Sequence, residues 1–424
     1  MLVGMSAAAL GCAGRGGPET SAGAATAAAT ATATAVPGAA VRPGIEVLLA
    51  DSAHLVRGRR VGLVTNQTGV DGRGRRDVDR LREAGIRVTT LFGPEHGLYG
   101  RIQVDAAVER PSFVDSSTGL PAYELHDGRR PVAPTPEQLS QVDVLLVDLQ
   151  DVGARYYTYT VTASLVMEAA ARAGLPVVIL DRPNPIGGLV QGNALDTLGA
   201  SAVARLPLAM RHGMTLGEVS RLARGALGLD LDLRIVPAAG WRRGMRFEHT
   251  GLPFVPPSLN LRSPESLYHY PGLCLFEGTN LSVGRGTGDA FRQVGAPWLD
   301  TTAVLARLRA ARVPGVSFEG AAFTPRAPGD GKHPDTPLTG IRLTATDPAR
   351  YDPTLAAAHL LAALRAVHPD AFAFTPAQFD RLAGGPETRE AILRGEGGAA
   401  VAALWAPSRA RFLDRRRPFL IYPE

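Results

Sequence analysis

Glu95 and His96 are the neighbouring side chains of this sequence best suited to acid–base chemistry. They follow residues 87–92 (RVTTLF), whose β-branched and apolar side chains predict a buried parallel strand. Gly93 and Pro94 end that strand, because proline has no N–H for a neighbouring strand and restricts the residue before it. The pair is therefore expected at the carboxyl end of a strand, where open α/β sheets bind their ligands.

Polar side chains also follow the other predicted strands, at 60–65, 142–149 and 177–180. Because the carboxyl ends of parallel strands meet at one edge of a sheet, these side chains are expected to share a rim. With polar residues from later segments, the candidate rim consists of Asn66, Gln67, Glu95, His96, Asp148, Asp151, Arg155, Tyr157, Asp181, Asn184, His212, Glu277, Asn280 and Arg285.

Carboxylates, amides, arginine and tyrosine together suit the binding of a sugar better than hydride or phosphoryl transfer. Glycosidic cleavage needs one carboxylic acid to protonate the leaving oxygen, and a second group to stabilise or attack the oxocarbenium-like centre. Glu95 is the predicted acid, since partial burial in a cleft would favour its protonated form. His96 would orient it, and Asp151 or Glu277 is the candidate second group.

Each of these residues also has a purely structural interpretation. A single aspartate after a strand, such as Asp148 or Asp181, is often a solvated loop residue or a helix N-cap. His96 and His212 could serve only to hydrogen-bond backbone carbonyls. The recurrence of polar clusters after every predicted strand is what the structural interpretation explains poorly.

Several mechanisms are excluded by missing motifs. Lys332 is the only lysine and has Gly329 three places before it, so no Ser-x-x-Lys motif exists. The sequence has no Gly-x-Ser-x-Gly and no His-Glu-x-x-His, and the first predicted strand runs into Asn66-Gln67-Thr68-Gly69 instead of a dinucleotide-binding Gly-x-Gly-x-x-Gly. We therefore expect no metal and no cofactor.

The elements that position the rim alternate between strand and helix patterns. Helices are predicted at 45–55, 76–84, 136–141, 160–173 and 216–226, and a last strand at 231–237. Gly174 is in C-cap position, and Thr215 with Glu218 fits a capping box. Residues 97–134 are predicted to be a long loop. The alternation predicts an α/β fold, with a Rossmann-like parallel sheet domain over residues 44–240.

Residues 241–424 predict a second, smaller α+β domain that contributes to the same cleft. From residue 240 the chain is rich in proline. Strands are predicted from residue 273 into Glu277, near 340–346 and at 418–422, and a helix at 355–367.

Residues 1–43 read as a signal-like segment and a linker. The apolar residues 2–11 end at Cys12 and resemble the end of a bacterial lipoprotein signal, so we expect export to the cell envelope and a possible lipid on Cys12. Residues 13–42 are an Ala/Thr/Gly/Pro tract with a flexible reach of roughly 30 Å. The formal charge is +5, but no arginine run is interleaved with aromatic residues, so a nucleic-acid partner is not expected.

Long motifs give the chain a family resemblance over roughly residues 44–424. They are GLVTNQTG (62–69), LFGPEHG (91–97), DLQDVGARYYTY (148–159), LDRPNPIGG (180–188), RHGMTLGE (211–218), and LFEGTNLSVGRGT followed by GAPW (275–287, 295–298). In these the chain resembles the exo-acting β-N-acetylmuramidases of glycoside hydrolase family 171, long known as a domain of unknown function. The resemblance implies a Rossmann-like domain joined to a smaller one, with the active site in the cleft between them.

The resemblance also implies removal of terminal N-acetylmuramic acid from the non-reducing ends of peptidoglycan fragments, with Glu95 as catalytic glutamate. Under this hypothesis hydroxyls, the acetamido group and the lactyl carboxylate would be bound by Asn66, Gln67, Arg155, Asp181, Asn184 and Arg285, and the planar fork of arginine is suited to the carboxylate. The alternative hypothesis is a non-catalytic peptidoglycan-binding lipoprotein on the same scaffold, and a third is a nucleotide-dependent enzyme. Retention or inversion and the oligomeric state are left open.

Overall fold

The computed structural model describes residues 40–102, 112–199, 201 and 203–424, which belong to one compact unit of the chain, Gly38–Glu424. Cys12 and the predicted signal segment lie outside the described residues. Within these ranges, no helix has the length and apolar character needed to cross a membrane.

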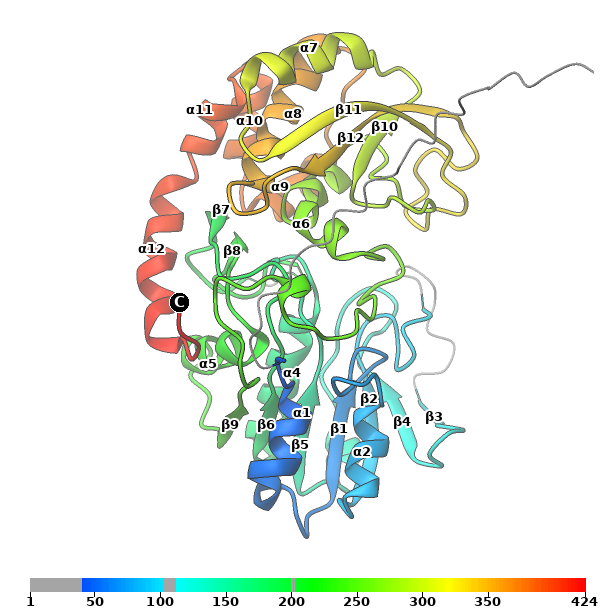
Figure 1. Ribbon diagram of the computed structural model, residues 1–424, viewed down its shortest axis with the longest axis vertical. Coiled ribbons are helices and arrows are strands. Elements are labelled where there is room, and N and C mark those ends of the chain that lie inside the picture. Colours follow the sequence, from blue (N-terminus) through cyan, green and yellow to red (C-terminus); the bar gives the residue numbers. More distant parts are fainter. Residues whose placement is uncertain (1–39, 103–111, 200, 202) are drawn as a thin grey trace, which may run out of the picture. The chain divides into compact units, whose positions relative to one another are not determined.

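The first domain is built on a seven-stranded sheet (Figure 1). Its order is β3-β4-β2-β1-β5-β6-β9, and all neighbours are parallel except the edge pair β3 and β4. The strands are β1 (Val61–Thr65), β2 (Val88–Gly93), β3 (Ser112–Val114), β4 (Pro121–Glu124), β5 (Val144–Asp148), β6 (Val177–Leu180) and β9 (Leu233–Val236). The predicted parallel sheet is thus confirmed.

Helices cover both faces of this sheet. In β5, Leu145 and Val147 join the core that contains α4 (Tyr159–Ala173), whereas Val144 and Leu146 join the core that contains α1 (Gly44–Val47) and α2 (Asp77–Glu83). This alternation explains why the central strands are continuous apolar runs, because both of their faces are removed from water. Two further α-helices of this domain are α3 (Pro136–Leu139) and α5 (Leu216–Ala226), and α5 begins with the predicted Thr215–Glu218 capping box.

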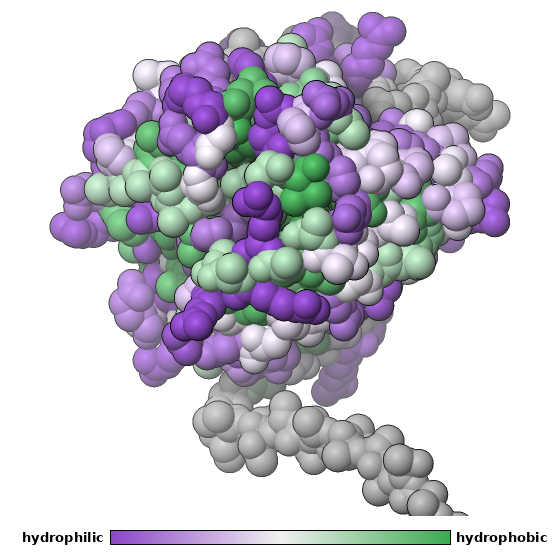
Figure 2. Space-filling view, turned by 90° about the horizontal axis from the view of Figure 1, so that it is seen from above, coloured by the Kyte–Doolittle hydropathy of each residue, from purple (hydrophilic) through white to green (hydrophobic). Residues whose placement is uncertain are grey.

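The second, smaller domain contains a three-stranded antiparallel sheet of order β10-β12-β11. Its elements are α6 (Pro264–Leu273), the 3₁₀ helix η4 (Cys274–Gly278), β10 (Gln293–Ala296), α7 (Thr301–Ala311), β11 (Val316–Phe323), β12 (Leu338–Ala345), α8 (Pro353–Val367), α9 (Pro376–Ala383), α10 (Glu387–Leu393), α11 (Gly398–Ala403) and α12 (Ala406–Arg416). A separate hairpin pairs β7 (Gln191–Ala194) with β8 (Ala209–Arg211). On the face seen in Figure 2, hydrophilic and hydrophobic residues are interspersed.

Three predicted segments differ in the structure. The apolar run leading into Glu277 is helical (α6 and η4) and not a strand, because Ser263 caps a helix that continues through Pro271. Residues 418–422 also form no strand, since Arg417–Phe419 is a 3₁₀ helix. The predicted loop 97–134 contains β4, which pairs in parallel with β2. The domain boundary near residue 240 stays a prediction.

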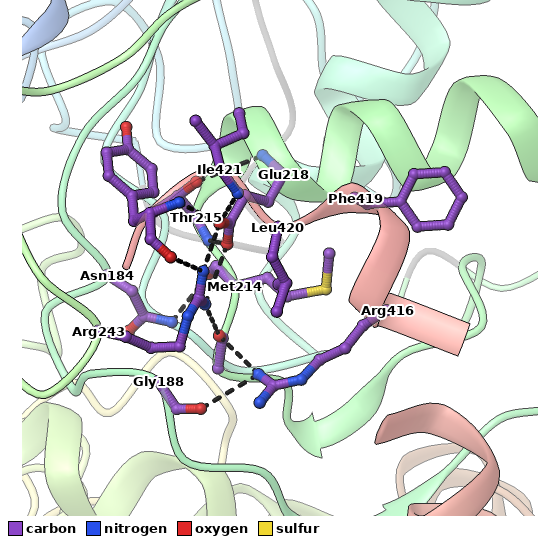
Figure 3. Close-up of polar contacts among 12 residues, drawn as sticks. Asn184, Gly188, Met214, Thr215, Glu218, Arg243, Arg416, Phe419, Leu420 and Ile421 are labelled. Atoms are coloured by element: carbon purple, nitrogen blue, oxygen red, sulfur yellow. Dashed lines mark hydrogen bonds and ion pairs between the residues drawn. The ribbon is translucent and has the colours of Figure 1, made fainter. Parts of the chain in front are cut away.

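The carboxyl-terminal segment returns to the first domain and is held there by buried charges (Figure 3). Glu218 of α5 accepts hydrogen bonds from Arg243 Nη2 at 2.5 Å and from the Ile421 backbone N–H at 2.7 Å. Arg416 donates to the carbonyl oxygens of Gly213 at 2.9 Å and Gly188 at 3.1 Å. The last residues of the chain are therefore part of the first domain's packing.

Candidate functional site

Glu95 lies on a tight turn that follows β2. The turn is packed against Glu124, the last residue of β4: a Cβ at Gly93 would collide with the Glu124 carboxylate and lie 2.6 Å from the Leu98 nitrogen. Gly97 and His96 have φ values of 76° and 71°, in the left-handed region. A non-glycine residue there is strained, and such strain is typical of functional turns. The local sequence thus fixes where Glu95 points.

The Glu95 side chain is 11% exposed, and its carboxyl group has two neighbours that orient it. The Thr158 hydroxyl, next to the start of α4, donates a hydrogen bond to Oε2. His96 Nε2 lies 3.8 Å from Oε1. His96 Nδ1 is 2.9 Å from the Ile102 carbonyl oxygen and must donate to it, so a neutral His96 turns its unprotonated Nε2 toward Glu95.

The carboxyl group of Glu95 lines an inner cavity of about 160 Å³. Four aromatic rings, from two separate parts of the chain, share its wall. The lining residues are Glu95, His96, His126, Arg129, Pro131, Tyr156, Tyr157, Thr158, Val203, Ser258, Leu261, Tyr270, Cys274, Glu277, Arg285, Phe291 and Leu382. Aromatic faces beside a buried carboxyl group and an arginine are suited to one sugar ring.

Glu277 and Arg285 bring a charged pair to the same cavity. Arg285 Nη2 is 2.5 Å from Glu277 Oε1, and the Cys274 thiol donates to Oε2 at 3.5 Å. Burial lowers the pKa of Arg285, but the neighbouring Glu277 carboxylate raises it above its usual value. Lys332 fixes the backbone here, donating to the carbonyl oxygens of residues 276, 277 and 281. An ionised Glu277 can stabilise positive charge, which suits the second group.

An outer cavity of about 400 Å³ continues from the inner one, because both are lined by His96, Arg129, Glu277 and Arg285. Its other lining residues are Leu259, Asn260, Pro328, Gly329, Asp330, Lys332, Gln378 and Arg381. Within the described residues, no cluster of histidine, cysteine and carboxylate side chains could hold a metal ion.

Five of the predicted site residues line these cavities: Glu95, His96, Tyr157, Glu277 and Arg285. Tyr157 contributes its ring, since its hydroxyl donates to the Pro257 carbonyl oxygen at 2.8 Å. The sequence motifs therefore found one wall of the cavity from the first domain and one from the second.

Asp151 and His212 lie together but line neither cavity. Asp151 Oδ2 is 3.3 Å from His212 Nε2 and accepts from the Gly153 N–H at 2.8 Å. His212 Nδ1 accepts from the Met214 N–H, so a neutral ring carries its proton on Nε2, toward Asp151. Of the two candidates for the second group, the geometry favours Glu277.

The structure does not bring the remaining predicted residues to the cavities, because their polar atoms are used within the protein. Asp148 forms a buried ion pair with Arg182, and Asp181 accepts from the hydroxyls of Thr215 at 2.6 Å and Tyr422 at 2.7 Å. Burial raises the pKa of Asp181 to about 6, and these hydroxyls oppose the shift. Their role in binding substrate stays a prediction.

The predicted amides and Arg155 act as cross-links between loops. Arg155 Nη2 donates to the Leu382 carbonyl oxygen at 2.7 Å, and burial lowers its pKa. The amide nitrogens donate as follows: Asn66 to the Tyr159 hydroxyl at 2.6 Å, Gln67 to the Pro256 carbonyl at 3.0 Å, Asn184 to the Met214 carbonyl at 2.8 Å, and Asn280 to the Ala371 carbonyl at 2.8 Å. These residues therefore hold the surrounding loops together without lining either cavity.

Sequence reasoning missed Thr158, Glu124, Arg129 and Tyr270. Thr158 lies inside the motif 148–159 and directly precedes a predicted helix. The sequence does not show that its hydroxyl contacts Glu95. Glu124 was hidden in a segment predicted as loop. No sequence signal links Arg129 or Tyr270 to Glu95, because the contacts depend on how distant segments pack.

Comparisons with known proteins show relatives over most of the chain. Residues 61–265 match the family domain described as Exo-beta-N-acetylmuramidase NamZ, N-terminal, and residues 268–422 match its C-terminal counterpart. The chain is 39% identical over 385 residues to the peptidoglycan beta-N-acetylmuramidase NamZ of Bacillus subtilis (strain 168), covering 90% of this chain and 91% of that protein.

Two solved structures share the fold, both DUF1343 family proteins from Bacteroides fragilis NCTC 9343. One is 31% identical with a TM-score of 0.81, over 91% of this chain and 100% of that one. The other is 30% identical with a TM-score of 0.73, over 91% and 99% of the two chains. From the family domains and the Bacillus relative together, the chain belongs to the NamZ family of exo-beta-N-acetylmuramidases.

Proposed function

We propose that this protein is a glycoside hydrolase that releases N-acetylmuramic acid from the non-reducing ends of peptidoglycan fragments. The observation that carries the proposal is the placement of Glu95: its buried carboxyl lines a cavity with four aromatic rings and the Glu277–Arg285 pair. The relative from Bacillus subtilis bears the name of this activity.

Glu95 supplies the proton in this mechanism. Its Oε2 is held by the Thr158 hydroxyl, which leaves Oε1 to carry the proton. The proton moves to the glycosidic oxygen as the bond to the anomeric carbon breaks, and the bonding electrons stay on the leaving oxygen. Positive charge then develops at the anomeric carbon and its ring oxygen. The Glu277 carboxylate, held in place by its ion pair with Arg285, stabilises that charge until water adds to the anomeric carbon and releases a proton.

A defined disaccharide tests the proposal. N-Acetylmuramic acid linked β-1,4 to N-acetylglucosamine should be cleaved to the two free sugars, whereas the reversed disaccharide with N-acetylglucosamine at the non-reducing end should stay intact. Chromatography and mass spectrometry of the products measure the cleavage of both disaccharides. Cleavage of neither substrate would contradict the proposal, and binding without cleavage would identify a peptidoglycan-binding protein instead.

We propose further that the protein is exported and held at the cell envelope by a lipid on Cys12. The support is the apolar segment 2–11 before that cysteine and the Ala/Thr-rich tract after it, which suits a tether beside the cell wall. Labelling of the expressing cells with a radioactive fatty acid should mark the wild type and not a Cys12→Ala variant. Equal labelling of both would contradict this proposal.

A further inference from the structure

Two arginines that line the outer cavity have no side-chain partner among the residues that the structure describes. Arg129 lies in the segment that follows β4, and Arg381 lies in the last turn of α9, 252 positions later in the chain. Both are exposed, and the structure gives neither guanidinium a hydrogen bond or ion pair within the described residues. Of the three arginines that line the two cavities, only Arg285 is paired within the described residues, so the two unpaired guanidinium groups on one cavity need an explanation.

The other cations of the outer cavity are already engaged. Arg285 is paired with Glu277, and the Lys332 ammonium donates to three backbone carbonyls. The cavity is lined by four cationic side chains and two carboxylates, leaving a formal surplus of two positive charges, 4 − 2 = 2. The four cations are Arg129, Arg285, Lys332 and Arg381, and the carboxylates are Glu277 and Asp330.

The surplus is carried by groups that a ligand can still reach. A guanidinium presents a planar fork of N–H donors that matches a carboxylate, and two such forks on one cavity form a receptor for an anion. Arg129 also lines the inner cavity, where Glu95 lies. An anion held by this pair would thus belong to the same molecule as the reacting sugar.

We propose that the outer cavity is a carboxylate subsite, in which Arg129 and Arg381 bind an acid carried on the O3 substituent of the muramic sugar. The inference rests on the proposed function, because it takes N-acetylmuramic acid as the substrate. The carboxylate has two chemical sources: the lactyl group itself, or the first residue of a peptide amide-linked to it. The pair acts on binding and specificity, while proton transfer remains with Glu95.

The test compares three chromogenic muramides with each variant: the free lactyl acid, its methyl ester and its L-alanyl amide. For Arg129→Gln and Arg381→Gln, loss of a charge-assisted contact should raise KM roughly 10-fold for the carboxylate form that the subsite binds and leave KM for the methyl ester unchanged. Arg130→Gln is the matched control, since Arg130 is a neighbouring exposed arginine that pairs with Asp127 and lines neither cavity.

Each outcome decides the proposal. A selective effect on the lactyl acid or on the alanyl acid supports the subsite and identifies the source of its carboxylate. Equal changes for the acids and the ester, as expected if the leaving sugar occupies this space, or no change at all, would overturn it.

A binding measurement keeps this test separate from the test of the activity. Isothermal titration of the wild type and the double variant with N-acetylmuramic acid and N-acetylglucosamine requires no turnover. Weakening of roughly 10-fold or more for the acidic sugar alone supports the subsite even if the wild type hydrolyses nothing. The same titration with N-acetylmuramoyl-L-alanine covers the second source of the carboxylate, and identical dissociation constants of the two proteins for both acidic ligands would overturn the subsite even if hydrolysis is found.

Discussion

Thr158 donates its hydroxyl hydrogen bond to Oε2 of Glu95, although the two residues are 63 positions apart in the sequence. Glu95 comes from the turn after β2, and Thr158 directly precedes α4. The contact therefore joins two motifs that the sequence shows only separately. It also makes the two oxygens of the carboxyl group unequal, because one accepts the threonine proton and the other is free to carry the catalytic one.

Replacing Thr158 by Val should lower kcat roughly 10- to 100-fold with little change in KM, because the loss of one hydrogen bond to the acid misorients it in the transition state. Thr158→Ser, which keeps the hydroxyl, is the matched control and should retain most of the activity. Steady-state kinetics on a chromogenic N-acetylmuramide measures both. A Thr158→Val enzyme with wild-type kcat would show that the contact does not position Glu95.

Glu124 predicts a pH dependence of stability. Burial without a cationic partner raises its pKa from 4.5 to about 7, and a weak hydrogen bond from the Leu98 N–H opposes the shift only slightly. Between these two values the folded protein binds more protons than the unfolded chain. The stabilisation contributed by Glu124 is therefore greatest below pH 4.5. It decreases by roughly 3 kcal/mol in total as the pH rises from 4.5 through 7.

Glu124→Gln should remove that dependence, because the neutral amide has no proton to lose. Urea unfolding at pH 5 and pH 8 should show a smaller difference for the variant than for the wild type. Glu319→Gln, at an exposed position of β11, is the control and should behave as the wild type does. An unchanged pH profile for Glu124→Gln would contradict the prediction.

The Glu218–Arg243 pair should be a large contributor to stability. Both side chains are 2% exposed or less, so Glu218→Ala leaves a buried guanidinium with only the exposed Glu424 carboxylate at 3.6 Å and should lower the free energy of unfolding by about 3–5 kcal/mol. It also removes the acceptor for the Ile421 N–H. Asp232→Ala breaks an exposed pair with Arg234 and should cost about 1 kcal/mol or less. A similar decrease in the free energy of unfolding for the two variants would contradict a large contribution from the Glu218–Arg243 pair.

Arg285 should matter for the chemistry through Glu277. Arg285→Met leaves the Glu277 carboxylate without the partner that lies 2.5 Å away, so Glu277 loses its fixed position in the cavity and kcat should fall roughly 10-fold or more. Arg285→Lys keeps a charge and should retain more activity. Steady-state kinetics on a chromogenic N-acetylmuramide checks this, and a wild-type kcat in Arg285→Met would contradict a role through Glu277.

The sheet was predictable because its strands are short apolar runs that end in Gly, Pro or polar residues. Val144–Asp148 and Val177–Leu180 are buried along their whole length. Short apolar runs that alternate with predicted helices are typical of the central strands of a parallel sheet. The apolar run before Glu277 was ambiguous for the same reason. Periodicity cannot separate a short buried strand from a buried helix, and Pro271 argued against the helix that forms.

The site was predictable only in part, because a polar residue after a strand has two uses. Glu95 faces the cavity. In contrast, Asp148 is paired with Arg182, and Asp181 accepts hydrogen bonds from the hydroxyls of Thr215 and Tyr422. Loops at the rim of a parallel sheet must satisfy their own buried polar groups. Which carboxylate is left for a substrate depends on these cross-links, and the sequence does not display them.

The most direct test of the account is the turnover by Glu95→Gln of N-acetylmuramic acid linked β-1,4 to N-acetylglucosamine, measured by chromatography of the products. The amide keeps the size and the hydrogen bond from Thr158 but has no acidic proton, so kcat should fall roughly 10²- to 10⁴-fold for a substrate with a poor leaving group, while the dissociation constant for N-acetylmuramic acid stays near that of the wild type. A Glu95→Gln protein that hydrolyses this substrate at the wild-type rate would contradict the account.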